Sequence, residues 1–233
     1  MIPTYNEREN ISRLINEILK LKIKDLHIVV VDDNSPDKTG EAVKEMEKKN
    51  GNVHLLLRTE DRGRGAAGRA GFIYCLENGA DAIVEMDADF SHDPKYIPAL
   101  LTELKNANVV LGSRRASGGK EIGRSPIRKL ITSLANLYIR IVLGIKVKDA
   151  NSGFRCFSKK AMEAIDPYKL TSKGPSIVQE VLFKAHLKGL RIKEVPIVFR
   201  DRTEGKSKLG FRQLAAGYWM VMKLKMQHMR GAL

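Results

Sequence analysis

The chain has 233 residues, of which 43% are hydrophobic and 29% are charged, a composition typical of one large folded domain or two small ones. This composition excludes a disordered or fibrous chain. Two cysteines, Cys75 and Cys156, are too few for a disulfide framework, and we find neither a secretion signal nor a run of about 18 apolar residues. We therefore expect a chain kept in a reducing, cytosolic environment, and neither a small secreted scaffold nor an integral membrane protein.

The net charge of +14 is divided unequally along the chain. Residues 1–110 hold 15 basic and 19 acidic residues, a net charge of −4, whereas residues 111–233 hold 26 basic and 8 acidic residues, a net charge of +18. This division indicates that the second half faces an anionic partner, such as a phosphate group, a membrane surface or a nucleic acid. A basic face that only contacts solvent explains the excess equally well.

The first half alternates between predicted helices and short strands. Asn6 and Glu9 form a variant of the capping box at the start of an amphipathic helix. Only two residues precede Pro3, so we expect any strand before this helix to be very short, either as a real feature or because the sequence starts late. The other expected elements are strands at 27–31, 53–57, 82–86 and 109–111 and helices at 67–76 and 94–104, with a polar helix ending at Asn50.

Strands separated by helices predict right-handed crossovers and an α/β fold, with a mainly parallel sheet flanked by helices. In the less regular second half we expect helices at 128–142, 175–187 and 211–233, a strand at 190–199 and a polar loop at 202–210. We assign a catalytic domain to residues 1–210 and a C-terminal amphipathic, membrane-proximal helix to residues 211–233. Because ligands bind beyond the carboxyl ends of parallel strands, the polar clusters after Val31 and Met86 are the expected places for chemistry.

Asp87 and Asp89 come directly after the strand at 82–86. Two carboxylates one residue apart can hold a hard divalent cation from one side and leave its other positions to water and phosphate oxygens, as Mg²⁺ prefers. Such an ion would bridge a diphosphate and offset the charge that develops as the diphosphate leaves. The alternative is that both are ordinary loop acids that form turns with Ser91 and Asp93.

Asp32 and Asp33 follow the neighbouring strand, so two acidic strand ends converge on one crevice. A carboxylate there can accept hydrogen bonds from a ribose or a base, or can simply satisfy its own turn. Residues 63–68 (GRGAAG) match the G-x-G-x-x-G pattern of dinucleotide-binding folds. Four polar residues separate these glycines from the preceding strand, so close helix packing explains them better than a nucleotide fingerprint does.

Positive charge follows the strand at 109–111 and fills the loop at 202–210. Arg114 and Arg202 offer bidentate forks to phosphate and Lys208 offers a mobile point charge, although each alone is more typical of a surface residue. The five histidines form no metal cluster, and no Ser-His-Asp arrangement can be assembled. His92 lies near Asp89 but is explained equally well as a cap of the following helix.

Four motifs occur together, in this order: PTYNE at 3–7, VDD at 31–33, DAD at 87–89 and NSGFR at 151–155. With them the chain resembles the inverting glycosyltransferases of family 2, which have the GT-A fold. Residues 86–94 (MDADFSHDP) and 201–209 (DRTEGKSKL) make it most similar to the dolichyl- and polyprenyl-phosphate mannose synthases of that family. The QxxRW motif of processive members is absent, which disfavours polymer synthesis, and the C-terminal spanning helices of some relatives are absent too.

The resemblance implies roles for individual residues. Asp87 and Asp89 would bind Mg²⁺ or Mn²⁺, and the backbone of Ala88 would touch the nucleotide. The residues that would hold the nucleoside of GDP-mannose are Pro3, Tyr5, Glu7, Val31 and Asp33. The residues that would act in catalysis are Asp89, Arg114, Arg202 and Lys208. Of these, the three cationic residues would bind the phosphates of the donor or of the lipid acceptor.

A polyprenyl or dolichyl phosphate is an acceptor that needs no general base. A phosphate monoester has a second pKa of about 6, so it is largely an anion near neutral pH. The enzyme must hold two anionic groups together despite their repulsion and stabilise the departing diphosphate, which are tasks for a metal ion and cationic side chains. In-line attack would invert the anomeric carbon and give a β-linked lipid-phosphate mannose.

Since this acceptor lies in a bilayer, we expect a peripheral protein at the cytoplasmic face of a membrane, alone or with a membrane partner subunit. The apolar stripe from Leu130 to Val142 can lie in the interface or face the core. Two other functions remain open, namely glucose transfer from UDP-glucose, which the motifs do not distinguish physically, and a basic nucleic-acid-binding module. The chain lacks the known sequence patterns of nucleic-acid-binding modules, and its 6% aromatic residues offer few side chains on which bases could stack. We therefore expect no nucleic-acid partner.

Overall fold

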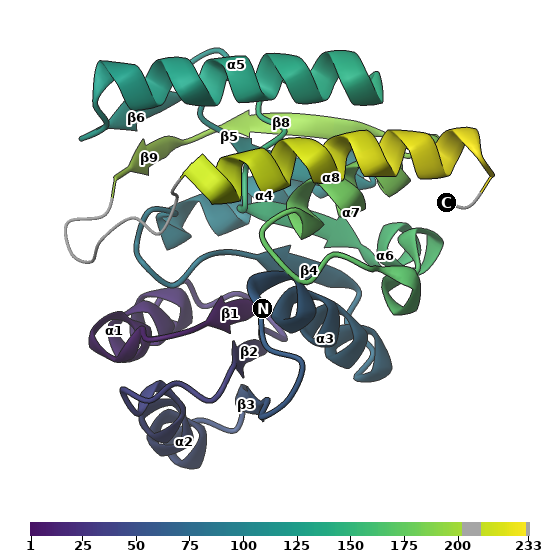
Figure 1. Ribbon diagram of the computed structural model, residues 1–233. Coiled ribbons are helices and arrows are strands. Elements are labelled where there is room, and N and C mark those ends of the chain that lie inside the picture. Colours follow the sequence, from purple (N-terminus) through teal and green to yellow (C-terminus); the bar gives the residue numbers. More distant parts are fainter. Residues whose placement is uncertain (202–210, 232–233) are drawn as a thin grey trace.

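The fold is that of a computed structural model, which describes residues 1–201 and 211–231 (Figure 1). Three strands form one sheet in the order β1-β2-β3, four form another in the order β4-β7-β5-β8, and β6 pairs with β9. Met1 bonds to Val84 and Met86 and so joins β1 to the edge of β4. The strands are β1 (Ile2–Thr4), β2 (Ile28–Asp32), β3 (Val53–Leu57), β4 (Ala82–Glu85), β5 (Val109–Ser113), β6 (Lys120–Ile122), β7 (Arg155–Ser158), β8 (Ile192–Pro196) and β9 (Val198–Arg200).

Helices cover both faces of this sheet, which confirms the expected α/β fold. Strand β2 is apolar without alternation because Ile28 and Val30 enter a core with α1, α2 and α4, while Val29 and Val31 enter a second core with α3 and α7. The helices are α1 (Arg8–Leu19), α2 (Thr39–Lys49), α3 (Arg64–Glu77), α4 (Ile97–Glu103), α5 (Pro126–Leu143), α6 (Lys159–Ile165), α7 (Ile177–Leu187) and α8 (Phe211–Met229), with short 3₁₀ turns η1 (Pro94–Tyr96), η2 (Leu104–Asn106) and η3 (Pro167–Lys169).

Strand pairing is mainly parallel, as expected, but β7 was not foreseen. Among the described strands, only β7 runs antiparallel to its neighbours, β4 and β5. It begins with the charged Arg155 and follows a loop instead of a helix, so neither its composition nor its position predicts a buried central strand. The single strand expected at 190–199 is in fact two strands, because Pro196 ends β8 and has no N–H to continue the pairing.

The capping box expected at the start of α1 is wrong. Glu7 occupies the N-cap position without a side-chain hydrogen bond, and Asn6 has a left-handed backbone with φ of 60°. The backbone N–H groups of residues 6, 7 and 8 instead donate to the side chains of Ser35, Thr39 and Asp37, respectively, each at 3.0 Å. The loop after β2 thus caps the helix after β1 and fixes the two strand ends against each other.

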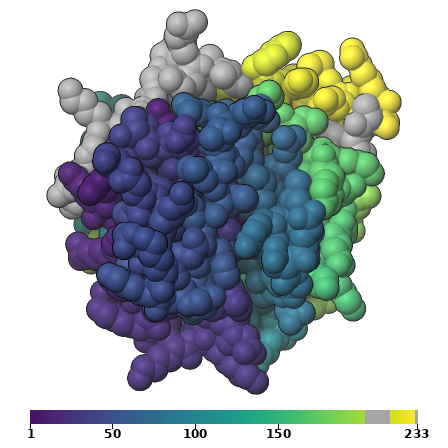
Figure 2. Space-filling model, turned by 90° about the horizontal axis from the view of Figure 1, so that it is seen from below, coloured from purple at the N-terminus to yellow at the C-terminus, as the bar shows by residue number. Residues whose placement is uncertain are grey.

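Helix α5 forms an outer layer beside α8, and its apolar stripe faces solvent instead of the core (Figure 1). Leu130, Leu134 and Ile141 are 60%, 54% and 71% exposed, whereas Ile139 and Leu143 on the other side of the helix are buried. In residues 1–201 and 211–231 no helix combines the length and the apolar character needed to span a bilayer. The side of the molecule seen from below is formed mainly by the N-terminal half, coloured purple to blue, with green and yellow parts of the second half along one edge (Figure 2).

Candidate functional site

The two carboxylates of the DAD motif lie in the turn that follows β4. Ala88 between them is buried, while Asp87 and Asp89 are half-exposed, and the N–H of Ser91 donates to Asp89 Oδ1 at 3.0 Å. Phe90 has a left-handed backbone with φ of 58°, a strained conformation for a bulky residue, and its ring packs under the guanidinium of Arg13 at 4.8 Å. The turn therefore holds both carboxylates at the carboxyl end of the sheet.

His92 supports this turn instead of capping the next helix. Its ring is 3% exposed, stacks on Phe154 with the ring centroids 5.2 Å apart, and accepts a hydrogen bond at Nδ1 from the N–H of Asp87 at 3.2 Å. Burial lowers the pKa of His92, so the ring is neutral with its proton on Nε2. The cap of η1 comes from Asp93, which accepts from the N–H of Lys95. The sequence left this role of His92 open.

A buried group of charges lies directly behind the DAD turn. Glu85 and Arg155 face each other as register partners of β4 and β7, both 0% exposed, and Arg155 donates from Nε and Nη2 to Glu85 Oε2. Arg64, the first residue of α3, pairs with Glu85 Oε1 at 2.8 Å and with Asp87 Oδ1 at 3.4 Å. Our sequence interpretation missed all three residues, although a glutamate inside the apolar strand AIVEM is a signal that could have found them.

The residues around Asp87 fit a divalent cation. A Cβ added to Gly153 would lie 3.2 Å from Asp87 Oδ2, so the glycine of the NSGFR motif leaves space beside this oxygen. Asp87 and Asp89 supply hard oxygen donors, as Mg²⁺ and Mn²⁺ require. Within the described residues no group of three or more His, Cys, Asp or Glu side chains gathers in a metal-binding arrangement.

The residues expected to hold a nucleoside gather at the ends of β1 and β2. Pro3 and Val31 are buried register partners of these parallel strands. Beyond them, Tyr5 is 44% exposed, and Glu7 is half-exposed and accepts from Asn10. The structure therefore places a buried apolar floor and two accessible side chains side by side.

The two aspartates after β2 have different partners. Asp32 satisfies its own turn, since it accepts from the N–H of Ser35 and from Thr4 Oγ1. Asp33 accepts from Arg58 Nη1 and, at 2.7 Å, from the N–H of Gly63. Asp33 thus ties the nucleoside end of the sheet to the glycine-rich segment before α3.

The G-x-G-x-x-G pattern is a packing device. The backbone carbonyl of Lys173 accepts the N–H groups of Gly65 and Ala66, so the start of α3 already has an acceptor from the chain itself. A Cβ on Gly65 would lie 2.1 Å from the carbonyl oxygen of Ser172. This confirms close approach of a helix as the reason for these glycines.

The arginines after β5 form a cluster with excess positive charge. Asp149, fully buried, binds Arg114 through Nε at 2.8 Å and Nη2 at 2.7 Å, and Arg114 lies over the ring of Phe199. Burial would raise the pKa of Asp149, but Arg114 outweighs this and lowers it. The side chains that surround Glu121 in this cluster are Arg114, Arg115 and Arg124. The other two predicted phosphate-binding residues, Arg202 and Lys208, lie outside the described residues.

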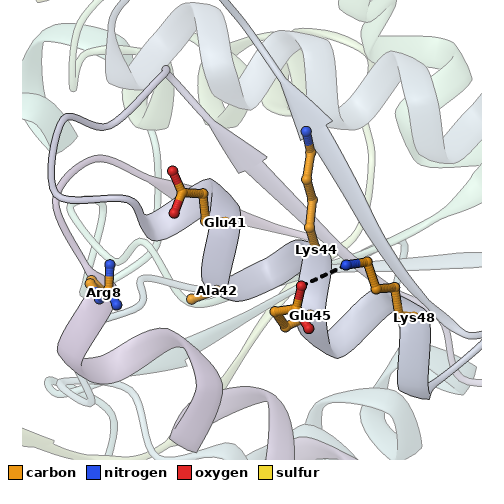
Figure 3. Close-up of a pocket in the computed structure, with 6 residues that line it drawn as sticks. All are labelled: Arg8, Glu41, Ala42, Lys44, Glu45 and Lys48. Atoms are coloured by element: carbon orange, nitrogen blue, oxygen red, sulfur yellow. Dashed lines mark hydrogen bonds and ion pairs between the residues drawn. The ribbon is translucent and has the colours of Figure 1, made fainter.

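Two cavities differ in their relation to this site. A groove of about 1120 Å³ runs between α1, the DAD turn and β9, and its lining includes Asp89, Arg13 and Arg200. A smaller cavity of about 290 Å³ lies between the start of α1 and the outer surface of α2 (Figure 3). It is lined by charged side chains, among them the ion pair of Glu45 and Lys48, and contains no predicted site residue. We therefore locate the functional site at Asp89.

Comparisons with known proteins show the family of the chain. Residues 1–166 match the family described as Glycosyl transferase family 2. The chain is 40% identical over 209 residues to an undecaprenyl-phosphate mannosyltransferase of Micrococcus luteus (90% of this chain, 86% of that one) and 38% identical over 212 residues to a polyprenol monophosphomannose synthase of Mycolicibacterium smegmatis (90% and 79%). A solved glucosyl-3-phosphoglycerate synthase of Mycobacterium tuberculosis, in complex with Mn²⁺, UDP and glucosyl-3-phosphoglycerate, superimposes with a TM-score of 0.69 over 97% of this chain and 77% of that one. At 18% identity this likeness shows the shared GT-A fold alone.

Proposed function

Because the chain belongs to glycosyl transferase family 2, we propose that it transfers mannose from GDP-mannose to a polyprenyl or dolichyl phosphate with inversion at the anomeric carbon. Membership decides for an enzyme and against the nucleic-acid-binding module. The observation that carries the proposal is that the chain has both an acidic site, at Asp87 and Asp89 after β4, and a cluster of arginines after β5. Relatives named as mannosyltransferases of polyprenyl phosphates support the substrate class.

In this proposal the chain positions two anionic groups. Asp87 and Asp89 would hold Mg²⁺ or Mn²⁺, which would supply positive charge to offset that of the leaving diphosphate. Pro3, Val31 and Ala88 form the floor for the nucleotide, with Tyr5, Glu7 and Asp33 around its nucleoside. The arginine cluster, together with Arg202 and Lys208, attracts the acceptor phosphate, which attacks without a general base because it is already an anion.

Donor competition tests the proposal. The protein is incubated with a polyprenyl phosphate in mixed micelles and with labelled GDP-mannose or labelled UDP-glucose, and the label in the lipid fraction is counted. We expect transfer from GDP-mannose and a β-linked product. Release of UDP but not of GDP would overturn the mannose assignment and favour the UDP-glucose alternative.

We further propose that the exposed face of α5 docks on the membrane that holds the acceptor. Leu134 and Ile141 lie on a face whose edges carry exposed Arg128, Lys129 and Arg140. Beside it, Trp219 of α8 is 65% exposed, as is typical of an interfacial residue. Helices α1 and α2 of the N-terminal half, whose net charge is −4, lie on the far side of the molecule from α5 (Figure 1). This arrangement turns the basic half toward anionic lipid, and residues 211–233 would be the membrane-proximal helix, alone or with a membrane partner subunit.

The cytoplasmic face is the membrane side that this proposal assigns. The thiols of Cys75 and Cys156 are free and buried, which suits a reducing compartment.

Replacing the apolar side chains of α5 is expected to weaken docking. The double variant Leu134→Ser and Ile141→Ser should bind vesicles of phosphatidylglycerol and phosphatidylcholine at least about tenfold more weakly, since each apolar side chain contributes about 1.5–3 kcal/mol on burial. Co-sedimentation measures this, and binding of the unaltered protein should fall as salt rises. Tyr168→Ser, which changes a 62% exposed ring on η3, is the control and should bind as before. Equal sedimentation of all three proteins would contradict docking through α5.

A further inference from the structure

The side chain of Arg64 lies between two carboxylates, and the proposed transfer reaction assigns no role to a cation in this position. Its side chain is 22% exposed, and it reaches Glu85 at 2.8 Å and Asp87 at 3.4 Å. Its Nη1 and the facing Oε1 of Glu85 have no hydrogen-bond geometry, whereas Arg155 donates two hydrogen bonds to the other oxygen of Glu85. Arg64 is therefore the more loosely held of the two arginines, and it lies on the side of the DAD turn.

The charges of this group cancel before any ligand arrives. Glu85 and Asp87 carry two negative charges, and Arg64 and Arg155 carry two positive ones. A guanidinium is always charged in a protein, so Arg64 carries its full positive charge. His92 contacts Asp87 by accepting its backbone N–H at Nδ1. A divalent cation that approaches Asp87 thus meets a carboxylate that is already neutralised and a guanidinium a few ångströms away.

We propose that Arg64 is a positioning residue that occupies Asp87 in the nucleotide-free protein and keeps its affinity for a divalent cation low until a diphosphate is present. This inference rests on the proposed function, because it concerns the same metal site. A nucleoside diphosphate at this site adds negative charge near Asp87 and favours the cation over the guanidinium. Arg64 remains attached to Glu85 and needs to move only from its longer, 3.4 Å contact.

The arrangement makes metal and nucleotide binding cooperative. If the cation binds well only when the diphosphate is present, then by linkage the diphosphate binds well only with the cation. Arg64 sets the size of this coupling, because it weakens cation binding to the nucleotide-free state alone. Removing the charge of Arg64 should therefore strengthen cation binding to the nucleotide-free protein. The difference in cation affinity between the nucleotide-free and the nucleotide-bound protein should then be smaller.

Mn²⁺ binding to the variant Arg64→Met tests the proposal. The free Mn²⁺ signal in electron paramagnetic resonance is titrated with nucleotide-free protein, and binding of a fluorescent GDP derivative is measured with and without Mn²⁺. We expect Arg64→Met to bind Mn²⁺ at least about tenfold more tightly than the unaltered protein, because a repelling charge near the ion is gone. Arg62→Met is the control, since it removes the same charge from an exposed position two residues away and should change the affinity less than twofold.

A second variant keeps the test decisive if Arg64→Met folds poorly. Compared with Glu85→Gln alone, Arg64→Met with Glu85→Gln additionally lacks the guanidinium that contacts Asp87, so the comparison isolates the effect of Arg64 on Asp87 when Glu85 is already uncharged. The double variant should bind Mn²⁺ more tightly than Glu85→Gln alone, with folding checked by thermal unfolding. Unchanged or weaker Mn²⁺ binding in both Arg64 variants would overturn the role of Arg64. Failure of the unaltered protein to bind Mn²⁺ even with GDP would instead count against the proposed function.

Discussion

Asp89→Ala is expected to lower mannose transfer by at least about 100-fold while the chain stays folded. The side chain lines the groove beside α1 and supplies one of two carboxylates for the cation that would oppose the leaving diphosphate. Loss of one preorganised electrostatic group at a reacting centre typically costs about 10²–10³ in rate. Transfer is measured as labelled mannose in the lipid fraction, and folding by circular dichroism.

Two further variants separate charge from structure in this prediction. Asp89→Asn keeps an acceptor for the N–H of Ser91 but loses the charge, so it should be nearly as inactive as Asp89→Ala. Asp93→Ala removes an acid from the same turn whose side chain caps η1, and it should lose about 1 kcal/mol of stability while keeping its transfer activity. Full activity in Asp89→Ala would show that the DAD turn has only a structural role.

Local patterns predicted most of the fold. The run HIVVV read as a strand covered on both faces, and the alternation of strands and helices gave the parallel sheet, because both signals depend on neighbouring residues. Strand β7 was missed because its place between β4 and β5 depends on contacts with residues about 70 and 45 positions earlier, and because it starts with a buried arginine. The cap of α1 was missed for the same reason, since its partners come from the loop after β2.

The site shows the same division. Asp87, Asp89 and the carboxyl ends of β1 and β2 could be placed from the sequence, because acidic residues directly after buried strands converge at one sheet edge. The partners that set their electrostatics could not. Arg58 with Asp33, Arg64 with Asp87 and Asp149 with Arg114 are contacts of 23 to 35 positions in sequence separation that no local spacing encodes.

Arg155→Met is expected to lower the free energy of unfolding by about 3–5 kcal/mol. The substitution leaves the fully buried Glu85 without the arginine that donates two hydrogen bonds to it and with Arg64 alone, whose contact lacks hydrogen-bond geometry, and a poorly compensated buried charge is costly. Urea unfolding followed by circular dichroism measures the loss. Lys193→Met breaks an ion pair with Glu103 whose side chains are 43% and 32% exposed, and it should cost less than about 1 kcal/mol.

The double variant Arg155→Met with Glu85→Met should recover part of this stability, because apolar side chains of similar volume often replace a buried ion pair without loss, while Arg64 keeps only its contact with Asp87. The pH dependence gives an independent check. Burial raises the pKa of Glu85, but Arg155 and Arg64 outweigh burial and hold it below its ordinary value of 4.5. In the unaltered protein the ionised pair therefore stabilises the fold above about pH 4.5, and this contribution is lost as the pH falls through the lower folded-state pKa.

In Arg155→Met burial acts on Glu85 with only the loosely held Arg64 to oppose it, so the pKa of this carboxyl should be higher than in the unaltered protein. The carboxyl of the variant then takes up its proton at a higher pH, and the stability deficit relative to the unaltered protein should shrink as the pH is lowered. A deficit that stays constant or grows as the pH is lowered would mean that the lost stability comes from packing of the arginine side chain and not from the charge it leaves on Glu85.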